Sequence, residues 1–369
     1  MRICIDARWI FEHMSGIGVH TRELIRALSE LDRDNEYRVL YCDEALRRRT
    51  EGETGYLDYD NWESRVVPWS VFSPAGQLKM PGWLKREAID VFHSTNYMIP
   101  LWAFSLRRSD PIKCVVTLHD LIPILFRDHA PKSRKARLFP VYMYIMRQVV
   151  ARAHTIITVS DASARDVREH LQPTGQVVTV YNGISSRYQQ NRDVERVDII
   201  LYVGRFDPYK NVPLLVEAFA DARERIERPV TLQIIGAEDP RYPEALQVAK
   251  QRGVNEFIDW THYVSDEELL NAYQSARVLV LPSDYEGFGM PVLEAMACGT
   301  PAICARSSSL PEVAGEAGLF FEPGNREQLT DLLVQVFDQG GPSAAQLTDQ
   351  ASKFTWDRAA RHTLEVYRS

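Results

Sequence analysis

The sequence contains few cysteines and no long hydrophobic run. Its five cysteines are an odd number, none forms a Cys-x-x-Cys pair, and most lie inside apolar runs, so neither a disulfide framework nor a zinc site is indicated. No stretch of 18 uncharged apolar residues occurs, and the first residues, "MRICIDAR", are charged and lack a signal-peptide pattern. We therefore expect a cytoplasmic protein, with at most peripheral contact with the inner face of a membrane.

The sequence also lacks a strong excess of positive charge. Its net charge is -7, and no basic stripe accompanies a known reader motif, which argues against nucleic-acid binding. The charge is unevenly divided, since residues 1–190 hold 26 Lys and Arg against 22 Asp and Glu, and the remainder holds 17 against 28. Basic and aromatic residues alternate over 131–154, which predicts a helix resting on an anionic membrane or, equally, a solvated helix packed by its apolar side.

Short β-branched runs alternate with helical patterns along the whole chain. Its 369 residues, 45% of them hydrophobic, exceed one compact core of ordinary size, so we expect two domains. Runs of four to seven apolar residues bounded by turn residues, with helices between them, indicate parallel sheets covered on both faces. The predicted strands are residues 2–8, 37–43, 65–70, 89–95, 114–120, 155–160, 177–183, 198–204, 231–236, 257–260, 277–282, 301–305 and 318–323.

This alternation predicts an α/β protein made of two doubly wound, Rossmann-like domains. The first domain is expected over residues 1–190 and the second over 191–350, with the boundary in the polar stretch 185–198. Residues 351–369 have helical spacing and should form a last helix. The apolar residues on related faces of that helix are Trp356, Ala360, Leu364 and Tyr367.

The first candidate site residues lie in "ARWIFEHMSGIGVHTRELIRAL", after the first predicted strand. Ser15, Gly16 and Gly18 make a small-residue turn, and a helix should start near Val19. Backbone N–H groups at such a turn and helix start suit an anion. Taken alone, the same glycines are equally compatible with a plain tight turn.

The second candidate is "VGRFDPYKN", which follows the first strand of the second domain. It places Arg205 and Lys210 where ligands of such sheets bind, outside the carboxyl ends of the strands. A forked, permanently charged donor beside a compact ammonium suits a diphosphate. The alternative is two surface cations in a loop.

The third candidate is "SDYEGFGMPVLEAMACGTPAIC", which places two carboxylates around a glycine loop and a helix start. Gly289 lets the backbone pass close to a ligand, and the N–H groups of Phe288, Gly289 and Met290 would aim at a phosphate or sugar oxygen. Glu286 precedes the helix and Glu294 lies one turn inside it, so they cannot share a proton. They are better placed to grip two ends of an extended ligand through its hydroxyls.

Two further patterns are weaker evidence for functional residues than the three candidates above. His119 follows a strong strand in "VVTLHD" and would face the ligand from the first domain, although a histidine at a strand end is also a common structural anchor. The "DYD" at 58–60 looks like the D-x-D motif of metal-dependent sugar transferases. It sits in a polar loop and not after an apolar strand, so we interpret it as loop and expect no required metal.

The stretch "EGFGMPVLEAMACGTPAIC" resembles the E-x7-E motif of retaining family-4 glycosyltransferases with the GT-B fold. Arg205 and Lys210, the "GIG" loop and the tail around Trp356 fit the same family, and the resemblance covers nearly the full chain. It implies two Rossmann-like domains facing a central cleft, with a last helix that crosses back to the first domain. It also implies transfer of a sugar from a nucleotide diphosphate sugar with retained anomeric configuration, without a cofactor.

The resemblance implies a role for each donor-site residue of the second domain. Arg205 and Lys210 would hold the diphosphate, and Glu286 with the backbone of 288–290 would contact the donor sugar. Glu294 would bind the ribose.

The resemblance assigns roles in the remaining loops as well. Gly16 and Gly18 would approach the diphosphate, and His119 would lie against the transferred sugar or the acceptor. The loop "DWTHYV", which contains Tyr263 and Val264, matches the position where such enzymes hold the base.

The donor and acceptor follow from narrower resemblances. "SGIGVHTRELIRAL" and "VVTLHDLIPI" resemble bacterial O-antigen and exopolysaccharide mannosyltransferases that use GDP-mannose, which we favour over UDP-glucose or UDP-N-acetylglucosamine. The expected partners are this nucleotide sugar and a saccharide or lipid-linked saccharide acceptor, with possible contact between the first domain and an anionic membrane. A non-hydrolysing sugar-nucleotide epimerase and a non-catalytic nucleotide-sugar-binding protein are the alternatives of another class.

Overall fold

The computed structural model describes residues 1–126, 138–237 and 239–369, which divide into two compact units. Unit 1 comprises Met1–Leu121, Leu138–Gly183 and Thr355–Ser369, and unit 2 comprises Ile184–Phe354 with the segment that begins at Ile122. Apart from the segment that begins at Ile122, the chain changes unit after Gly183 and again after Phe354. Of the basic stretch 131–154, residues 131–137 lie outside the described part of the chain.

Unit 1 is built on a parallel seven-stranded sheet with the order β3-β2-β1-β4-β5-β6-β7. The central strand β4 is buried at all four positions, as expected for a strand covered on both faces. The strands are β1 (Arg2–Asp6), β2 (Glu36–Tyr41), β3 (Trp62–Val66), β4 (Val91–Ser94), β5 (Lys113–Leu118), β6 (Thr155–Thr158) and β7 (Gln176–Thr179).

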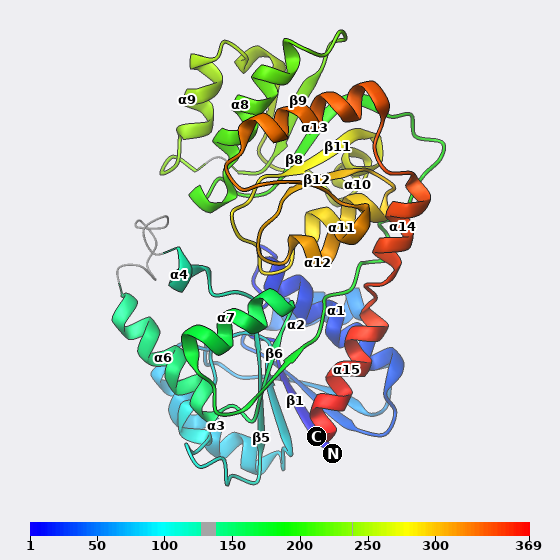
Figure 1. The fold of residues 1–369 in the computed structure, drawn as a ribbon. Coiled ribbons are helices and arrows are strands. Elements are labelled where there is room, and N and C mark those ends of the chain that lie inside the picture. The colour runs from blue at the N-terminus through cyan, green and yellow to red at the C-terminus, as the bar shows by residue number, and fades with distance from the viewer. Residues whose placement is uncertain (127–137, 238) are drawn as a thin grey trace. The chain divides into compact units, whose positions relative to one another are not determined.

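Helices cover both faces of this sheet. Figure 1 shows α1, α2 and α15 on one side and α3 and α6 on the other. The helices are α1 (Gly16–Leu31), α2 (Glu44–Thr54), α3 (Pro74–Arg86), α6 (Phe139–Arg152), α7 (Asp161–Leu171) and α15 (Trp356–Arg368), with 3-10 turns η1 (Tyr56–Asp58) and η2 (Leu101–Ala103).

The last helix, α15, completes the core of unit 1. Its buried side chains include Ala360, Leu364 and Tyr367, which pack with α1 and with strands β1 and β2. The Tyr367 hydroxyl lies 2.7 Å from Nδ1 of His93, whose Nε2 contacts the Thr117 hydroxyl at 2.8 Å. Burial lowers the pKa of His93 to about 3, so this histidine is neutral and links α15 to the sheet through its two hydrogen bonds.

Unit 2 repeats the same plan with six parallel strands in the order β10-β9-β8-β11-β12-β13. The strands are β8 (Val197–Val203), β9 (Thr231–Ile235), β10 (Ile258–Thr261), β11 (Ala276–Leu281), β12 (Ala302–Ala305) and β13 (Leu319–Phe321). The helices are α4 (Ile122–Leu125), α8 (Val212–Arg223), α9 (Glu244–Gln251), α10 (Asp266–Ser275), α11 (Met290–Ala297), α12 (Leu310–Ala314), α13 (Arg326–Gln339) and α14 (Ala344–Ser352), with turns η3 (Pro208–Lys210), η4 (Asn255–Phe257) and η5 (Gly315–Ala317).

The predicted fold class is confirmed, and all thirteen predicted strands correspond to strands of the structure, with one displaced. The third strand was expected at 65–70 but occupies Trp62–Val66. Pro68 cannot donate a ladder hydrogen bond, and Trp62 instead pairs with Tyr37 and stacks on its ring at 3.9 Å. Among the described residues, no helix combines the length and hydropathy that crossing a membrane requires.

Candidate active site

The strand order places the candidate residues of unit 2 at one point of the sheet. Between β8 and β11 the order reverses, so the loops that follow these two neighbouring strands leave in opposite directions and open a crevice for a ligand. Arg205 and Lys210 follow β8, and Glu286 follows β11. The sequence therefore brings these three residues to the same end of the sheet from separate loops.

Lys210 and Glu286 form a close ion pair. Lys210 Nζ lies 2.6 Å from Oε1 and 2.8 Å from Oε2 of Glu286, and the Ser283 hydroxyl donates to Oε1 at 2.7 Å. The side chains are only 16% and 10% exposed. The cation expected at the diphosphate and the carboxylate expected at the sugar thus hold each other in the free protein.

A run of three serines after β12 braces the glycine loop, and the sequence analysis missed it. The Ser308 hydroxyl accepts the Glu286 N–H at 2.7 Å, and the Ser309 hydroxyl contacts the Glu286 and Phe288 carbonyl oxygens at 2.9 and 2.8 Å. The Ser307 hydroxyl donates to the Ser283 carbonyl at 2.7 Å. Consecutive serines directly after an apolar strand, in "AICARSSSLPE", were the signal that could have revealed this support.

Gly289 sets the start of helix α11. Its φ of 102° is left-handed, and an added Cβ would lie 2.7 Å from Leu310 Cδ2, so glycine is required for both reasons. No side chain among the described residues caps this helix start, which leaves the N–H groups around Met290 without a side-chain acceptor. The Phe288 ring is buried against Phe354 at 5.8 Å, so only its backbone belongs to the site.

Glu294 occupies a separate position inside α11. The Tyr273 hydroxyl donates to its Oε2 at 2.7 Å, and Tyr188 also interacts with the carboxylate. Burial raises the pKa of the Glu294 carboxyl, while the two tyrosines and Arg187 lower it by less. Because Glu286 and Glu294 have different partners, the structure agrees with two independent carboxylates and not a proton-sharing dyad.

Arg205 and the loop after β10 are much more exposed. The Arg205 side chain is 70% exposed and its Nε lies 2.9 Å from Asp207, while the Tyr202 hydroxyl donates to its carbonyl oxygen at 2.6 Å. Tyr263 is 88% exposed, and Val264 is half-buried in the same short loop before α10. The ligand-free structure therefore leaves these side chains at the surface of unit 2.

In unit 1 the glycines lie inside helix α1 and not before it. The helix was expected to start near Val19, but it begins at Gly16, with Ser15 as the N-cap whose hydroxyl accepts the Gly18 N–H at 3.3 Å. A good cap lengthens the helix toward its start. A Cβ on Gly18 would lie 2.8 Å from Met14 Sδ, whereas Gly16 faces open space.

His119 lies at the same sheet edge as this helix start. Its Nε2 donates to the Thr95 carbonyl oxygen at 3.0 Å, and the Thr21 hydroxyl of α1 contacts the Thr95 hydroxyl at 2.8 Å. Burial lowers the pKa of His119, so the ring is neutral near pH 7 and its Nδ1 is an acceptor.

The sequence analysis missed the partner of His119. The His20 ring packs edge-on against it at 4.7 Å, and His20 Nδ1 donates to Asn182 Oδ1 at 2.8 Å. The buried Nε2 of His20 has no hydrogen-bond partner among the described residues. His20, four residues after Gly16, was visible in "GIGVHT", but sequence alone does not show which face of α1 it occupies.

The "DYD" stretch precedes β3 and does not follow the carboxyl end of a strand. Asp58 is the last residue of η1, and Asp60 lies in the loop before β3. Within residues 1–126, 138–237 and 239–369, no group of three His, Cys, Asp or Glu residues is arranged to hold a metal ion.

Comparisons with known proteins agree across both units. The model of Glycosyl transferases group 1 matches residues 186–354, and that of Glycosyltransferase Family 4 matches residues 14–188. The chain is 27% identical to the O-antigen chain mannosyltransferase B of Escherichia coli, over 100% of both chains. It is 31% identical to an MMP alpha-(1->4)-mannosyltransferase of Mycolicibacterium hassiacum, over 100% of this chain and 98% of that one.

A solved structure shares the fold. The Anabaena HepE protein in complex with UDP and glucose superposes with a TM-score of 0.71 and 18% identity over 99% of both chains. Two Rossmann-like units, the matched family models and the full-length relatives lead to one conclusion. The chain is a glycosyltransferase of family 4 with the GT-B fold.

Proposed function

We propose that the protein transfers mannose from GDP-mannose, with retention of anomeric configuration, to a lipid-linked or oligosaccharide acceptor in bacterial surface polysaccharide synthesis. The observation that carries the proposal is the Lys210–Glu286 pair at the strand-order reversal of unit 2, where a sugar diphosphate needs a cation and a hydroxyl acceptor side by side. The full-length similarity to two mannosyltransferases supports mannose as the sugar.

In this proposal, different residues of unit 2 bind different parts of the donor. Lys210 leaves Glu286 for the diphosphate, which Arg205 also contacts, and Glu286 then accepts from sugar hydroxyls. The N–H groups at the start of α11, where the N-cap Gly289 provides no side-chain acceptor, point to oxygens of the same ligand. Glu294 accepts from the ribose, and the exposed loop with Tyr263 holds the base.

The residues of unit 1 act on the diphosphate and the transferred sugar. The first turn of α1, with Gly16 and Gly18, would approach a phosphate, whose oxygen would replace the Ser15 hydroxyl as the acceptor of the Gly18 N–H. His119 is neutral and its Nε2–H donates a hydrogen bond to the Thr95 carbonyl oxygen, so its Nδ1 accepts from a sugar hydroxyl of the donor or acceptor. The ring contact with His20 fixes this orientation.

The proposed reaction needs no protein base. The bond between the sugar C1 and the diphosphate oxygen breaks as an oxocarbenium-like centre develops, and Lys210 and Arg205 stabilise the leaving negative charge. The acceptor hydroxyl forms its bond to C1 on the same face and gives its proton to the departing phosphate oxygen. Because two cations already neutralise the leaving group, we propose no metal in this step.

The pH dependence of donor binding tests the role of Glu294. Burial raises the pKa of this carboxyl, so acidification protonates it at a higher pH than an exposed glutamic acid and removes an acceptor for the ribose. We expect the donor KM to rise as the pH falls through that raised pKa. In the Glu294→Gln variant, the KM should be about tenfold higher and lack this step, since a charged hydrogen bond contributes roughly 1.5–3 kcal/mol.

Protonation of Glu294 does not itself destabilise the fold, so the expected rise in KM cannot come from unfolding caused by this group. A raised pKa means that the folded state binds the proton more tightly than the unfolded chain, so protonation of this group stabilises the fold. Steady-state kinetics with varied donor, at saturating acceptor and several pH values, measure the effect. A parent KM as flat with pH as that of the glutamine variant would remove Glu294 from the ribose site.

Nucleotide preference tests the donor. Ligand that binds only the folded state raises its stability by mass action, by about 2.7 kcal/mol at a concentration of 100 times Kd. We expect GDP to raise the melting temperature more than UDP or ADP at equal concentration. A larger shift with UDP would reject GDP-mannose in favour of a UDP-glucose or UDP-N-acetylglucosamine donor, the alternative that the UDP-bound Anabaena structure favours.

We also propose that unit 1 contacts an anionic membrane peripherally. Helix α6 exposes Val141 and Tyr144, α3 exposes Leu78, and η2, which packs against both helices, exposes Trp102. Large apolar side chains flanked by basic residues suit the interface of an anionic bilayer. An absence of binding to anionic vesicles at low salt would contradict this part of the proposal.

A further inference from the structure

Unit 1 contains a polar pocket at the opposite edge of its sheet from His119. The pocket has a volume of about 620 Å³ and lies where strands β5, β6 and β7 begin, at Lys113, Thr155 and Gln176. His119 follows the far end of β5, roughly 20 Å away at about 3.3 Å per residue. The pocket is therefore separate from the residues proposed to act in sugar transfer.

Positive charge dominates the lining of this pocket. Arg107, Arg108 and Lys113 line it with a single carboxylate, Asp110, which accepts the Ser105 N–H at 2.5 Å. In the part of the chain that the structure describes, none of the three cations is in an ion pair with a carboxylate. Asp110 is thus the one carboxylate side chain of the lining that offsets its three positive charges.

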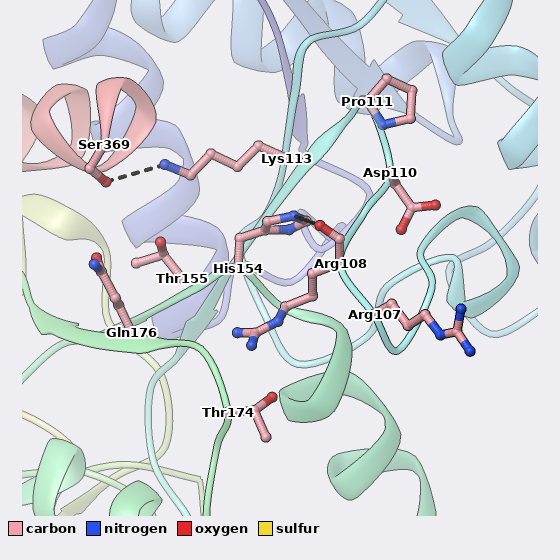
Figure 2. Close-up of a pocket in the computed structure, with 10 residues that line it drawn as sticks. All are labelled: Arg107, Arg108, Asp110, Pro111, Lys113, His154, Thr155, Thr174, Gln176 and Ser369. Atoms are coloured by element: carbon pink, nitrogen blue, oxygen red, sulfur yellow. Dashed lines mark hydrogen bonds between the residues drawn. The ribbon is translucent and has the colours of Figure 1, made fainter.

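Arg108 is held so that its guanidinium extends into the pocket. Its backbone is left-handed, with a φ of 51°, which is unfavourable for a residue other than glycine. His154 secures this conformation, because its Nε2 donates to the Arg108 carbonyl oxygen at 3.2 Å while its Nδ1 accepts the Cys114 N–H at 3.0 Å. Figure 2 shows the Arg108 side chain reaching toward Thr174 and Gln176, whereas Arg107 extends to the opposite side.

Lys113 contributes a second charge that is partly buried. Its ammonium donates to the Val366 carbonyl oxygen at 2.6 Å and to the Ser369 hydroxyl at 3.2 Å, which leaves one of its three N–H donors (Figure 2). Burial lowers the pKa of Lys113. Burial also lowers the pKa of His154, and repulsion from Arg108 and Lys113 lowers it further, which reports an electropositive environment.

We propose that this pocket binds a phosphate group, with Arg108 as the principal charge partner, Lys113 as the second, and the Gln176 amide and Thr174 hydroxyl as neutral hydrogen-bond groups. A guanidinium matches two phosphate oxygens at once, and the compact ammonium adds charge without a geometric demand. The group belongs either to a soluble phosphorylated molecule or to a phospholipid headgroup. Exposed Leu106, next to the two arginines, is compatible with both sources.

The soluble source is tested by titration calorimetry with inorganic phosphate and pyrophosphate. The full chain carries Arg205→Ala and Lys210→Ala in all samples, so that the proposed donor site does not contribute. We expect Arg108→Gln to weaken binding at least tenfold, because it removes the principal charge partner of the phosphate. The variant should still fold, since the guanidinium makes no described contact that folding needs. Lys250→Gln, which changes an exposed cation of α9 in unit 2, is the matched control and should change the Kd by less than twofold.

The lipid source is tested by cosedimentation with vesicles of phosphatidylcholine and phosphatidylglycerol. A headgroup ligand predicts that Arg108→Gln lowers the bound fraction, that Lys250→Gln does not, and that excess pyrophosphate displaces the parent protein. A soluble ligand predicts the calorimetric loss without any vesicle effect of Arg108→Gln. If Arg108→Gln binds both probes as the parent does, or if the Lys250 control loses as much affinity, the pocket is not a phosphate site.

Discussion

Replacing Lys210 by alanine is expected to lower the kcat of sugar transfer at least tenfold. The change removes the ammonium that would stabilise the departing diphosphate, and it leaves the Glu286 carboxylate, 10% exposed, with the Ser283 hydroxyl as its remaining described partner. Glu286→Ala and Arg205→Ala should each reduce turnover by a similar factor. Initial rates with radiolabelled donor sugar measure all three variants.

The matched control for these variants is Lys250→Ala. Lys250 is an exposed cation near the end of α9, without a described ion pair, so its loss should leave turnover within twofold of the parent. Near-UV circular dichroism shows whether each variant keeps its tertiary packing, because removing one partner of a largely buried ion pair is itself destabilising. Near-normal transfer by all three folded variants would falsify the proposed donor site.

Gly183→Ala is expected to produce a large loss of stability. A Cβ at this position would lie 2.1 Å from the backbone nitrogen of Trp356 and 2.5 Å from the carbonyl carbon of Thr355. Both atoms are backbone, so no side-chain rotation relieves the overlap, and we expect the free energy of unfolding to fall by about 3 kcal/mol or more. Differential scanning calorimetry should show a lower melting temperature.

Gly52→Ala provides a control of opposite sign. Gly52 lies inside α2 with no atom within 4 Å of an added Cβ, so alanine removes backbone entropy from the unfolded chain without a clash. The expected effect is a gain of roughly 0.5–1 kcal/mol. Equal melting temperatures for the two variants would show that the segment around Trp356 shifts to make room for the added Cβ, and would contradict the expected clash.

The fold could be predicted because its signals are local. Each buried parallel strand is a short apolar run bounded by turn residues, and this pattern located thirteen strands along the chain. The two misplaced boundaries depend on specific partners. Trp62 begins β3 because it stacks on Tyr37, and Gly16 begins α1 because Ser15 caps it, and an apolar periodicity shows neither contact.

The candidate site was predictable in its position but not in its pairing. A residue directly after a parallel strand lies at the edge where ligands bind, which sufficed to select Lys210, Glu286 and His119. That Lys210 pairs with Glu286, that Ser309 braces the loop, and that His20 packs on His119 depend on contacts between residues far apart in sequence. Such contacts are set by the packed tertiary structure, and one sequence contains no direct record of them.

The position of α15 has a consequence for how the protein is made. Ala359, Ala360, Leu364 and Tyr367 belong to the core of unit 1, yet they follow the whole of unit 2 in the chain. During synthesis, the ribosome delivers the sheet of unit 1 first and the helix that seals it last. While unit 2 is translated, part of the apolar face of strands β1 and β2 therefore stays exposed. We expect nascent chains to be most vulnerable to aggregation, and most dependent on chaperones, during this interval and not after folding is complete.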